Sequence, residues 1–138
     1  MADVLAVCML IYELAPDAVY SSPVHVGAGT VKCAHGVLPV PAPATEILLR
    51  GVPYYSEDIK CELCTPTGAA LIKYFTDKFD ERPVMTVNKT GYGTGVKELM
   101  RANVVRVSLG EIEDAGDRVL ELKCNLDDMT GEALGFAM

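Results

Sequence analysis

The sequence predicts an α+β fold, a single domain with a mostly antiparallel sheet and about three helices. The chain has 138 residues, enough for one domain with a real core, and half of its residues are apolar. Helical and strand-like patterns are mixed along it, without an internal repeat, coiled coil or low-complexity tract. We therefore expect a folded chain and not a disordered one.

Two helices are expected in the first half of the chain. Residues 3–14 are apolar almost all round, which predicts a buried helix that Asp3 caps. A short helix is expected to begin at Pro43 and to end at Gly51, with an inner face formed by Ile47, Leu48 and Leu49. The two helices would pack against one or more sheets.

The clearest helix begins at the run Thr-Pro-Thr-Gly, residues 65–68. Thr65 is a good N-cap, and Pro66 suits the first helical position because no amide donor is needed there. The apolar residues that follow have helical spacing and predict one inner face, formed by Leu71, Ile72, Phe75 and Phe79.

The strand patterns predict two hairpins. Residues 17–26 are rich in Val, Ser and Tyr, and a glycine-bounded turn leads from them into a second strand over 30–33. Residues 105–109 and 120–124 alternate apolar and polar side chains on either side of an acidic turn, which predicts an antiparallel pair. A further strand is expected over 83–89, and the glycine-rich run 91–95 predicts a flexible loop.

Charge and composition narrow the class of partner. There are 12 basic and 19 acidic residues, so the net charge of −7 has the wrong sign for sequence-independent binding to nucleic acid. The apolar run 4–11 is too short to span a bilayer and follows an acidic residue, so no membrane association is expected. The odd number of five cysteines favours reduced thiols and a cytoplasmic location.

The run CAHGVLPVPAPAT, residues 33–45, places three prolines at alternate positions after a Cys-x-His-Gly. Proline fixes φ and lacks an amide donor, so this run predicts a stiff extended loop that is neither helix nor central strand. Such a loop is either a rigid connector or a support that holds neighbouring side chains in a set geometry.

The side chains that this loop could support are candidate metal ligands. The first predicted hairpin would bring His25, Cys33 and His35 near one another, and imidazole and thiolate are good ligands for nickel, zinc and copper. The alternative is that the histidines are buried and hydrogen-bonded within the fold.

Cys61 and Cys64 form a Cys-x-x-Cys, a spacing found in zinc and redox sites. A closed zinc site needs a second pair of ligands, and the predicted helix begins only after this motif, so we interpret the pair as incidental. Thr65, Thr67 and Gly68 offer backbone amides and hydroxyls at a helix N-terminus, which suits a phosphate or carboxylate. The alternative is an ordinary N-cap.

Two further groupings carry weaker signals. Gly91 and Gly93 belong to a run that could wrap a phosphate, but it lacks the lysine and the spacing of a phosphate-binding loop. Asp127 and Asp128, with Glu132, place three carboxylates within six residues, which suits a hard divalent ion that carries nucleotide phosphates. The alternative for this cluster is an acidic start of a helix.

Several runs occur in the order HVGAGTVKCAHGVLPVPAPATEILL, ELCTPTGAALIKYF, GYGTG, NVVRVSLGE and NLDDMTGE. In this order they resemble the nickel-insertion protein of the nickel-pincer nucleotide pathway, the LarC family. The resemblance extends over nearly the whole chain, and its most specific parts are HG-x-LPVPAPAT and TPTGAAL.

The resemblance implies an activity. Proteins of this family insert nickel into a pyridinium bis-thiocarboxylic acid mononucleotide, forming carbon–nickel and sulfur–nickel bonds. The reaction consumes CTP and uses manganese or magnesium, and its product is the cofactor of lactate racemase and related enzymes, which are downstream partners. A histidine is a suitable base for the ring proton that is lost when the carbon–nickel bond forms.

The resemblance also implies site residues. His35 is the expected catalytic residue, and the expected nickel-handling or metal-binding residues are His25, Cys33, His35, Asp127 and Asp128. The pincer precursor is expected at a second set of residues: Thr65, Thr67, Gly68, Gly91 and Gly93. Cys64 stands where the family pattern has threonine, which supports the view that the Cys-x-x-Cys is local to this protein.

Family members begin with a further His-rich region and continue into a domain that binds the metal–CTP complex. The resemblance thus implies a central α+β domain over 1–124 and the start of a truncated nucleotide-binding domain over 125–138. On this interpretation the chain is a fragment that is inactive alone. The alternatives are a metallochaperone or mononucleotide-binding module without turnover, and a structural scaffold. Homo-oligomerisation is left open.

Overall fold

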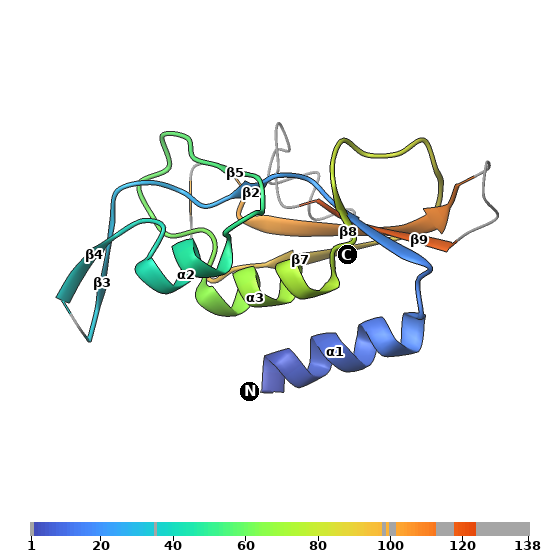
Figure 1. Ribbon diagram of the computed structural model, residues 1–138, viewed down its shortest axis with the longest axis horizontal. Coiled ribbons are helices and arrows are strands. Elements are labelled where there is room, and N and C mark those ends of the chain that lie inside the picture. Colours follow the sequence, from blue (N-terminus) through green and yellow to red (C-terminus); the bar gives the residue numbers. More distant parts are fainter. Residues whose placement is uncertain (1, 35, 98, 100–101, 113–117, 124–138) are drawn as a thin grey trace.

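The computed structural model describes residues 2–34, 36–97, 99, 102–112 and 118–123, the last range by its backbone alone. Its helices are α1 (Ala2–Leu14), α2 (Pro43–Leu48) and α3 (Pro66–Phe75). Its strands are β1 (Ala18–Ser21), β2 (Val24–His25), β3 (Thr30–Cys33), β4 (Gly36–Pro39), β5 (Tyr54–Tyr55), β6 (Lys78–Phe79), β7 (Thr86–Thr94), β8 (Val104–Glu111) and β9 (Arg118–Lys123). This mixture of helices with small sheets confirms the α+β class (Figure 1).

The main sheet has five strands in the order β6-β1-β9-β8-β7. β8 is antiparallel to β7 and to β9, and these two pairings are the longest in the described residues. The second predicted hairpin is therefore confirmed, with Val107 opposite Leu122 and Leu109 opposite Leu120. β1 adds to β9 and β6 in parallel, so the sheet is mixed although its long pairings are antiparallel.

The first predicted hairpin is wrong. The expected strand over 17–26 is divided into β1 and β2 at Ser22 and Pro23, because proline has no amide to donate to a ladder. β2 pairs in parallel with β5, and β3 pairs with β4. The β3–β4 hairpin projects from one end of the molecule (Figure 1). Cys33 lies on this hairpin, whereas His25 lies on β2, which belongs to another sheet.

The proline run connects this projecting hairpin to α2. Pro39 ends β4, which belongs to a two-stranded sheet and has no strand beyond it, and Pro43 opens α2. Both positions agree with the prediction that this run excludes a central strand, since each proline occupies a place where its missing amide is tolerated.

The glycine-rich run 91–95 is not the predicted flexible loop. Its first four residues belong to β7, where Gly91 lies opposite Val107 and Gly93 opposite Val105. Glycine weakens a strand, but the pairing with β8 satisfies the backbone here and overrides that local preference. The predicted strand over 83–89 begins later, at Thr86, and continues through the glycines.

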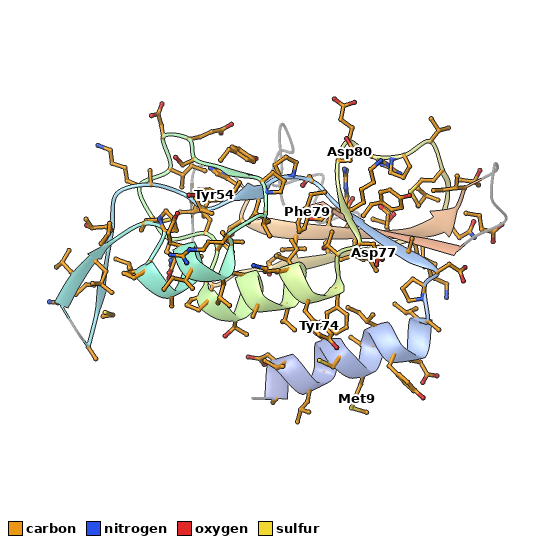
Figure 2. All side chains as sticks on the ribbon, viewed as in Figure 1. Met9, Tyr54, Tyr74, Asp77, Phe79 and Asp80 are labelled. Atoms are coloured by element: carbon orange, nitrogen blue, oxygen red, sulfur yellow. The ribbon has the colours of Figure 1, made fainter. Side chains whose placement is uncertain are left out.

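α1 is a helix as predicted, but none of its residues is buried. The described elements cover only one face, through which Val7 and Ile11 reach the cavity described below. On the other face Met9 is 70% exposed and Tyr12 88% exposed, and Figure 2 shows Met9 pointing away from α3. Asp3 lies in the first turn and not before the helix, so it is not the N-cap.

No helix in the described residues has the length and apolar character needed to span a bilayer.

α2 and α3 pack together under β2. Their shared core contains Val24, Val26, Leu49, Val52, Cys64, Ala69 and Ile72. α2 begins at Pro43 as predicted, but Ile47 is 57% exposed and the buried position of the helix is Thr45. α3 has the predicted cap and first residue, whereas Phe79 lies beyond it on β6 and packs against the core from there.

Candidate functional site

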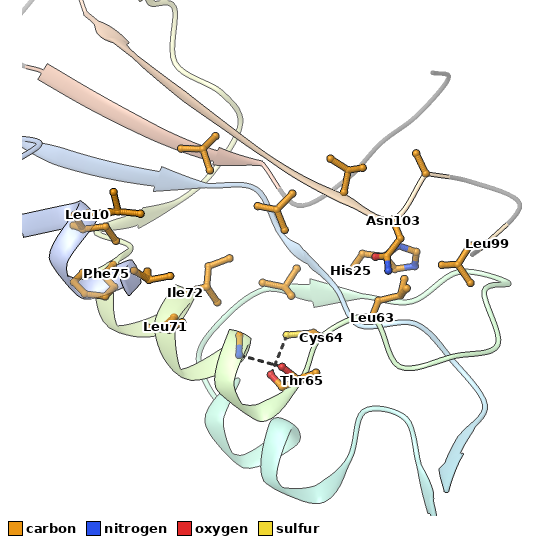
Figure 3. A pocket seen from close by; sticks show the side chains of 18 of the residues that line it. Leu10, His25, Leu63, Cys64, Thr65, Leu71, Ile72, Phe75, Leu99 and Asn103 are labelled. Carbon is orange, nitrogen blue, oxygen red and sulfur yellow. Dashed lines mark hydrogen bonds between the residues drawn. The ribbon is translucent and has the colours of Figure 1, made fainter. Parts of the chain in front are cut away.

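A cavity of about 560 Å³ lies between α1, α3, β2 and β8. Figure 3 shows His25 and Asn103 at one end of it and Leu10 and Phe75 at the other. Most of its described lining is aliphatic or aromatic, and none of that lining is Asp, Glu, Lys or Arg. A mainly apolar cavity with a few polar groups at one end is the usual form of a small-molecule site.

Three segments that are distant in the sequence meet at this cavity. β2 contributes Val24 and His25, the segment that leads into α3 contributes Leu63 to Thr65, and β8 with the residues before it contributes residues 102–105. Apart from Val24 and Ala102, these residues belong to the runs HVGAGT, ELCTPTGAAL and NVVRVSLGE. Three of the five runs that carry the resemblance thus contribute residues to the same cavity.

At the polar end of the cavity, His25 stacks on a neighbouring ring and accepts a hydrogen bond. Its ring is buried and stacks on Tyr55, with 4.7 Å between the ring centroids and 5° between the planes. The pairing of β2 with β5 places these two residues directly opposite each other. The His25 Nε2 atom accepts a hydrogen bond of 3.2 Å from the amide of Glu57. In this arrangement Nε2 carries no proton, and the proton of the neutral ring is on Nδ1.

These contacts bear on the predicted metal site. A nickel ion at Nε2 would compete with the Glu57 amide for the same lone pair, which favours the alternative of a buried, hydrogen-bonded histidine. Cys33 is exposed on the projecting hairpin, and His35 lies outside the described residues. In the part of the chain that the structure describes, no three His, Cys, Asp or Glu side chains are grouped as metal ligands would be.

The N-terminus of α3 contributes Thr65 and Gly68 to the cavity wall. The Thr65 hydroxyl accepts a hydrogen bond of 3.3 Å from the Gly68 amide, and Pro66 has no amide. The ordinary N-cap is therefore formed, and it uses one of the donors that an anion would need. Thr67 is exposed and is not part of the described lining, so the structure places two of the three predicted residues, Thr65 and Gly68, at the cavity.

Gly91 and Gly93 lie next to the cavity and not in its lining. Gly91 lies opposite Val107 and Gly93 opposite Val105, and both valines line the cavity. Residues directly opposite in an antiparallel pair share a face of the sheet. A Cβ added at either glycine would meet no atom of the described residues within 4 Å, so these residues leave space on that face of the sheet.

Cys64 also lines the cavity, and its thiol hydrogen-bonds the Thr65 carbonyl at 3.7 Å. Cys61 is half-buried, and neither Cys61 nor Cys64 forms a disulfide within the described residues. That the Cys-x-x-Cys is incidental stays a prediction. Asp127 and Asp128 lie outside the described residues. Away from the cavity, a hydrogen bond from Tyr54 to Glu46 raises the pKa of that phenol, and one from Lys78 lowers the pKa of Asp80.

Sequence reasoning missed two residues of the polar end. Tyr55 backs the His25 ring, but only the parallel pairing of two-residue strands brings it there. Asn103 lines the cavity just before β8, and its carbonyl accepts a hydrogen bond of 3.1 Å from the Gly95 amide. A Cβ at Gly95 would overlap the Asn103 side-chain amide, so this glycine allows the close approach. The spacing of Gly95 and Asn103 offered no sequence signal for this contact.

The structure is that of an α+β protein with a mainly apolar, partly open cavity, which makes it a candidate small-molecule site. The family model described as "Nickel insertion protein" matches residues 1–138. The chain belongs to this nickel insertion family.

Curated relatives agree with this assignment. The pyridinium-3,5-bisthiocarboxylic acid mononucleotide nickel insertion protein of Desulfitobacterium hafniense is 42% identical over 144 residues, covering 99% of this chain and 36% of the relative. The proteins of the same name from Acetivibrio thermocellus and Geobacillus kaustophilus are each 41% identical and cover 100% of this chain. The chain spans about a third of their length, at 35% and 36%. No solved structure is significantly similar to this chain.

Proposed function

We propose that this chain is part of a nickel-insertion enzyme that loads nickel into pyridinium-3,5-bisthiocarboxylic acid mononucleotide. The relatives carry this substrate in their names, and the family is that of nickel insertion proteins. The observation that carries the proposal beyond family membership is the cavity, because three distant runs of the resemblance line it together. The cavity is then the binding site of the mononucleotide, and the protein that contains this chain is a lyase-type metal-inserting enzyme.

The proposal divides the residues between two tasks. His25, Thr65 and Gly68 line the cavity and would contact the precursor, and the open sheet at Gly91 and Gly93 would admit it. Nickel would be delivered by Cys33 and His35, with His35 as the base that accepts the ring proton. Few and labile ligands suit a metal that must be passed on to carbon and sulfur.

The remaining parts of the reaction belong to the whole protein. CTP with manganese or magnesium would drive the insertion, and Asp127 and Asp128 are carboxylates of the type that such an ion prefers. They would begin a nucleotide-binding domain at residues 125–138, after the central domain over 1–124. The chain alone would not turn over. The nickel-loaded product of the whole protein would serve lactate racemase-type enzymes in the cytoplasm.

A calorimetric titration with nickel tests where the metal is handled. We expect micromolar binding that is lost in the Cys33→Ser, His35→Ala double variant, because these are the two proposed nickel ligands of the described and adjoining residues. His25→Ala is the matched single variant and is expected to keep nickel binding, since its Nε2 already accepts from the Glu57 amide. Parallel titrations with zinc and manganese measure selectivity.

Two outcomes would contradict this division of tasks. Loss of nickel binding in His25→Ala alone would place the metal in the cavity. No nickel binding by a folded parent chain would place the metal on other regions of the full-length protein and leave this chain with precursor binding only.

The second candidate is a binding module without turnover, and the absence of charged groups from the described cavity lining favours it. Such a module would bind the mononucleotide with an affinity that CTP does not change. Adding CTP and manganese to the full-length protein separates the two, since only the enzyme should then produce the nickel-loaded product.

A further inference from the structure

The polar end of the cavity is built from neutral groups. The Nε2 atom of His25 accepts from the Glu57 amide, so the ring carries a single proton and no charge. The Cys64 thiol donates to the Thr65 carbonyl at 3.7 Å, so it keeps its proton. Asn103 adds a carboxamide (Figure 3). Because the described lining also contains no Asp, Glu, Lys or Arg, it presents no formal charge to a ligand.

A lining of this kind discriminates between ligands by their net charge. An ion that enters it gives up hydration and meets no group of opposite charge, whereas a neutral group of similar shape loses less. The walls away from the polar end, which include Leu10, Leu71 and Phe75, offer an ion no compensating contact (Figure 3). Two forms of one ligand that differ in the charge of the buried part should therefore differ in affinity.

Nickel insertion changes the charge of the pyridinium head group. In the precursor the ring nitrogen carries one positive charge and the two ionised thiocarboxylates carry two negative charges, so the head group is an anion. Insertion of Ni²⁺ breaks one ring C–H bond. Its electron pair forms the carbon–nickel bond, the proton leaves to a base, and both sulfurs bind the metal. Nickel adds two positive charges and the departing proton removes one, so the loaded head group is neutral and nothing is oxidised or reduced.

We propose that the cavity binds the nickel-loaded mononucleotide in preference to the precursor, because only the loaded head group matches its uncharged lining. This inference rests on the proposed function for the identity of the ligand and for the bonds that nickel forms. It goes further by naming which of the two forms the cavity selects. A site that binds the product more tightly than the precursor shifts the bound equilibrium toward nickel insertion.

Calorimetric titration of the 138-residue chain with each form, in the absence of CTP, tests the selection. We expect the nickel-loaded mononucleotide to bind at least about tenfold more tightly than pyridinium-3,5-bisthiocarboxylic acid mononucleotide. That factor corresponds to leaving one buried polar group without a partner. The phosphate is common to both ligands, so its contribution cancels in the ratio of their affinities.

A charge series at one lining position tests the cause of the preference. Val105 lines the cavity and is 41% exposed, so polar side chains are tolerated there. Relative to the neutral Val105→Gln, we expect Val105→Lys to reduce the preference for the loaded form about threefold and Val105→Glu to raise it by a similar factor. Val87 is 37% exposed and outside the described lining, so the same three substitutions at Val87 should leave the ratio unchanged.

Three results would overturn the selection: equal affinity for the two forms, tighter binding of the precursor, or a ratio that does not follow the charge in folded Val105 variants. If those variants do not fold, the ratio for the parent chain decides. Equal affinity with normal nickel insertion by the full-length protein would leave the proposed function standing. Selective binding of the loaded form by a protein that inserts no nickel would refute the proposed function alone.

Discussion

Gly27 shows how a single residue shapes the polar end of the site. It follows β2 directly after Val26, has a φ of +83°, and pairs with Glu62 in an isolated bridge. A Cβ at this position would overlap the backbone carbonyl of Cys61. The contact joins the strand that carries His25 to the segment that leads into α3, so it maintains the spacing of two cavity walls.

Gly27→Ala should therefore destabilise the chain strongly. Gly51 is the matched control, since its φ of +81° is the same but an added Cβ would meet nothing within 4 Å. Gly51→Ala should lower the free energy of unfolding by about 1 kcal/mol, because alanine is strained in the left-handed conformation. The overlap at Gly27 should add a further penalty of about 1–3 kcal/mol. Urea denaturation measures the free energy of unfolding of both variants. Equal losses of stability in Gly27→Ala and Gly51→Ala would contradict the described contact.

Residue-level features were partly visible in the sequence. The cap at Thr65 and the prolines at α2 and α3 are local, so their pattern predicts them directly. His25 attracted notice because the chain has only 2 histidines. Its partners Tyr55 and Glu57 were missed because they lie some thirty positions later. Only the strand pairing brings them together, and local patterns do not encode such pairing.

At the scale of elements, the connection from α1 to β1 contains the clearest backbone strain. Ala15 has a φ of 41°, and its amide bonds the Ile11 carbonyl at 2.9 Å, so it closes the helix in a left-handed conformation. That position favours glycine, because a Cβ is strained there. α1 forms one wall of the cavity, and this residue sets the direction in which the helix leaves the sheet.

Ala15→Gly should raise the free energy of unfolding by roughly 0.5–1 kcal/mol, the strain that a Cβ adds at positive φ. Ala6 is exposed inside α1, so Ala6→Gly is the opposite control. It should lower the free energy of unfolding by about 1 kcal/mol. Thermal unfolding followed by circular dichroism compares the two. A destabilised Ala15→Gly would mean that the helix does not end as described.

Pairing between elements explains most of the wrong predictions. The β8–β9 hairpin was predicted because its strands are neighbours in sequence with matching alternation. The β2–β5 and β1–β9 pairs are parallel and join distant segments, so the pattern over 17–26 offered no sign of them. The glycines of β7 predicted a loop because their local preference is real, and the pairing with β8 outweighs it.

At the scale of the whole molecule, the account has one central claim. Three of the five runs that resemble the nickel-insertion family contribute residues to one mainly apolar cavity, and we propose that this cavity holds the precursor. The resemblance predicted the importance of these runs. It did not predict that they would share one space, because that depends on how α1, α3 and β8 pack.

The measurement that tests this claim most directly is the binding of pyridinium-3,5-bisthiocarboxylic acid mononucleotide to a chain with a blocked cavity. Val105 lines the cavity and is 41% exposed, so Val105→Trp should fill the space without disrupting the core. Val87 is 37% exposed and lies outside the described lining, which makes Val87→Trp the matched control. We predict that calorimetry finds binding weakened by more than about tenfold, about 1.4 kcal/mol, in Val105→Trp and unchanged in Val87→Trp. Equal binding by the parent and Val105→Trp, with both folded, would contradict the claim.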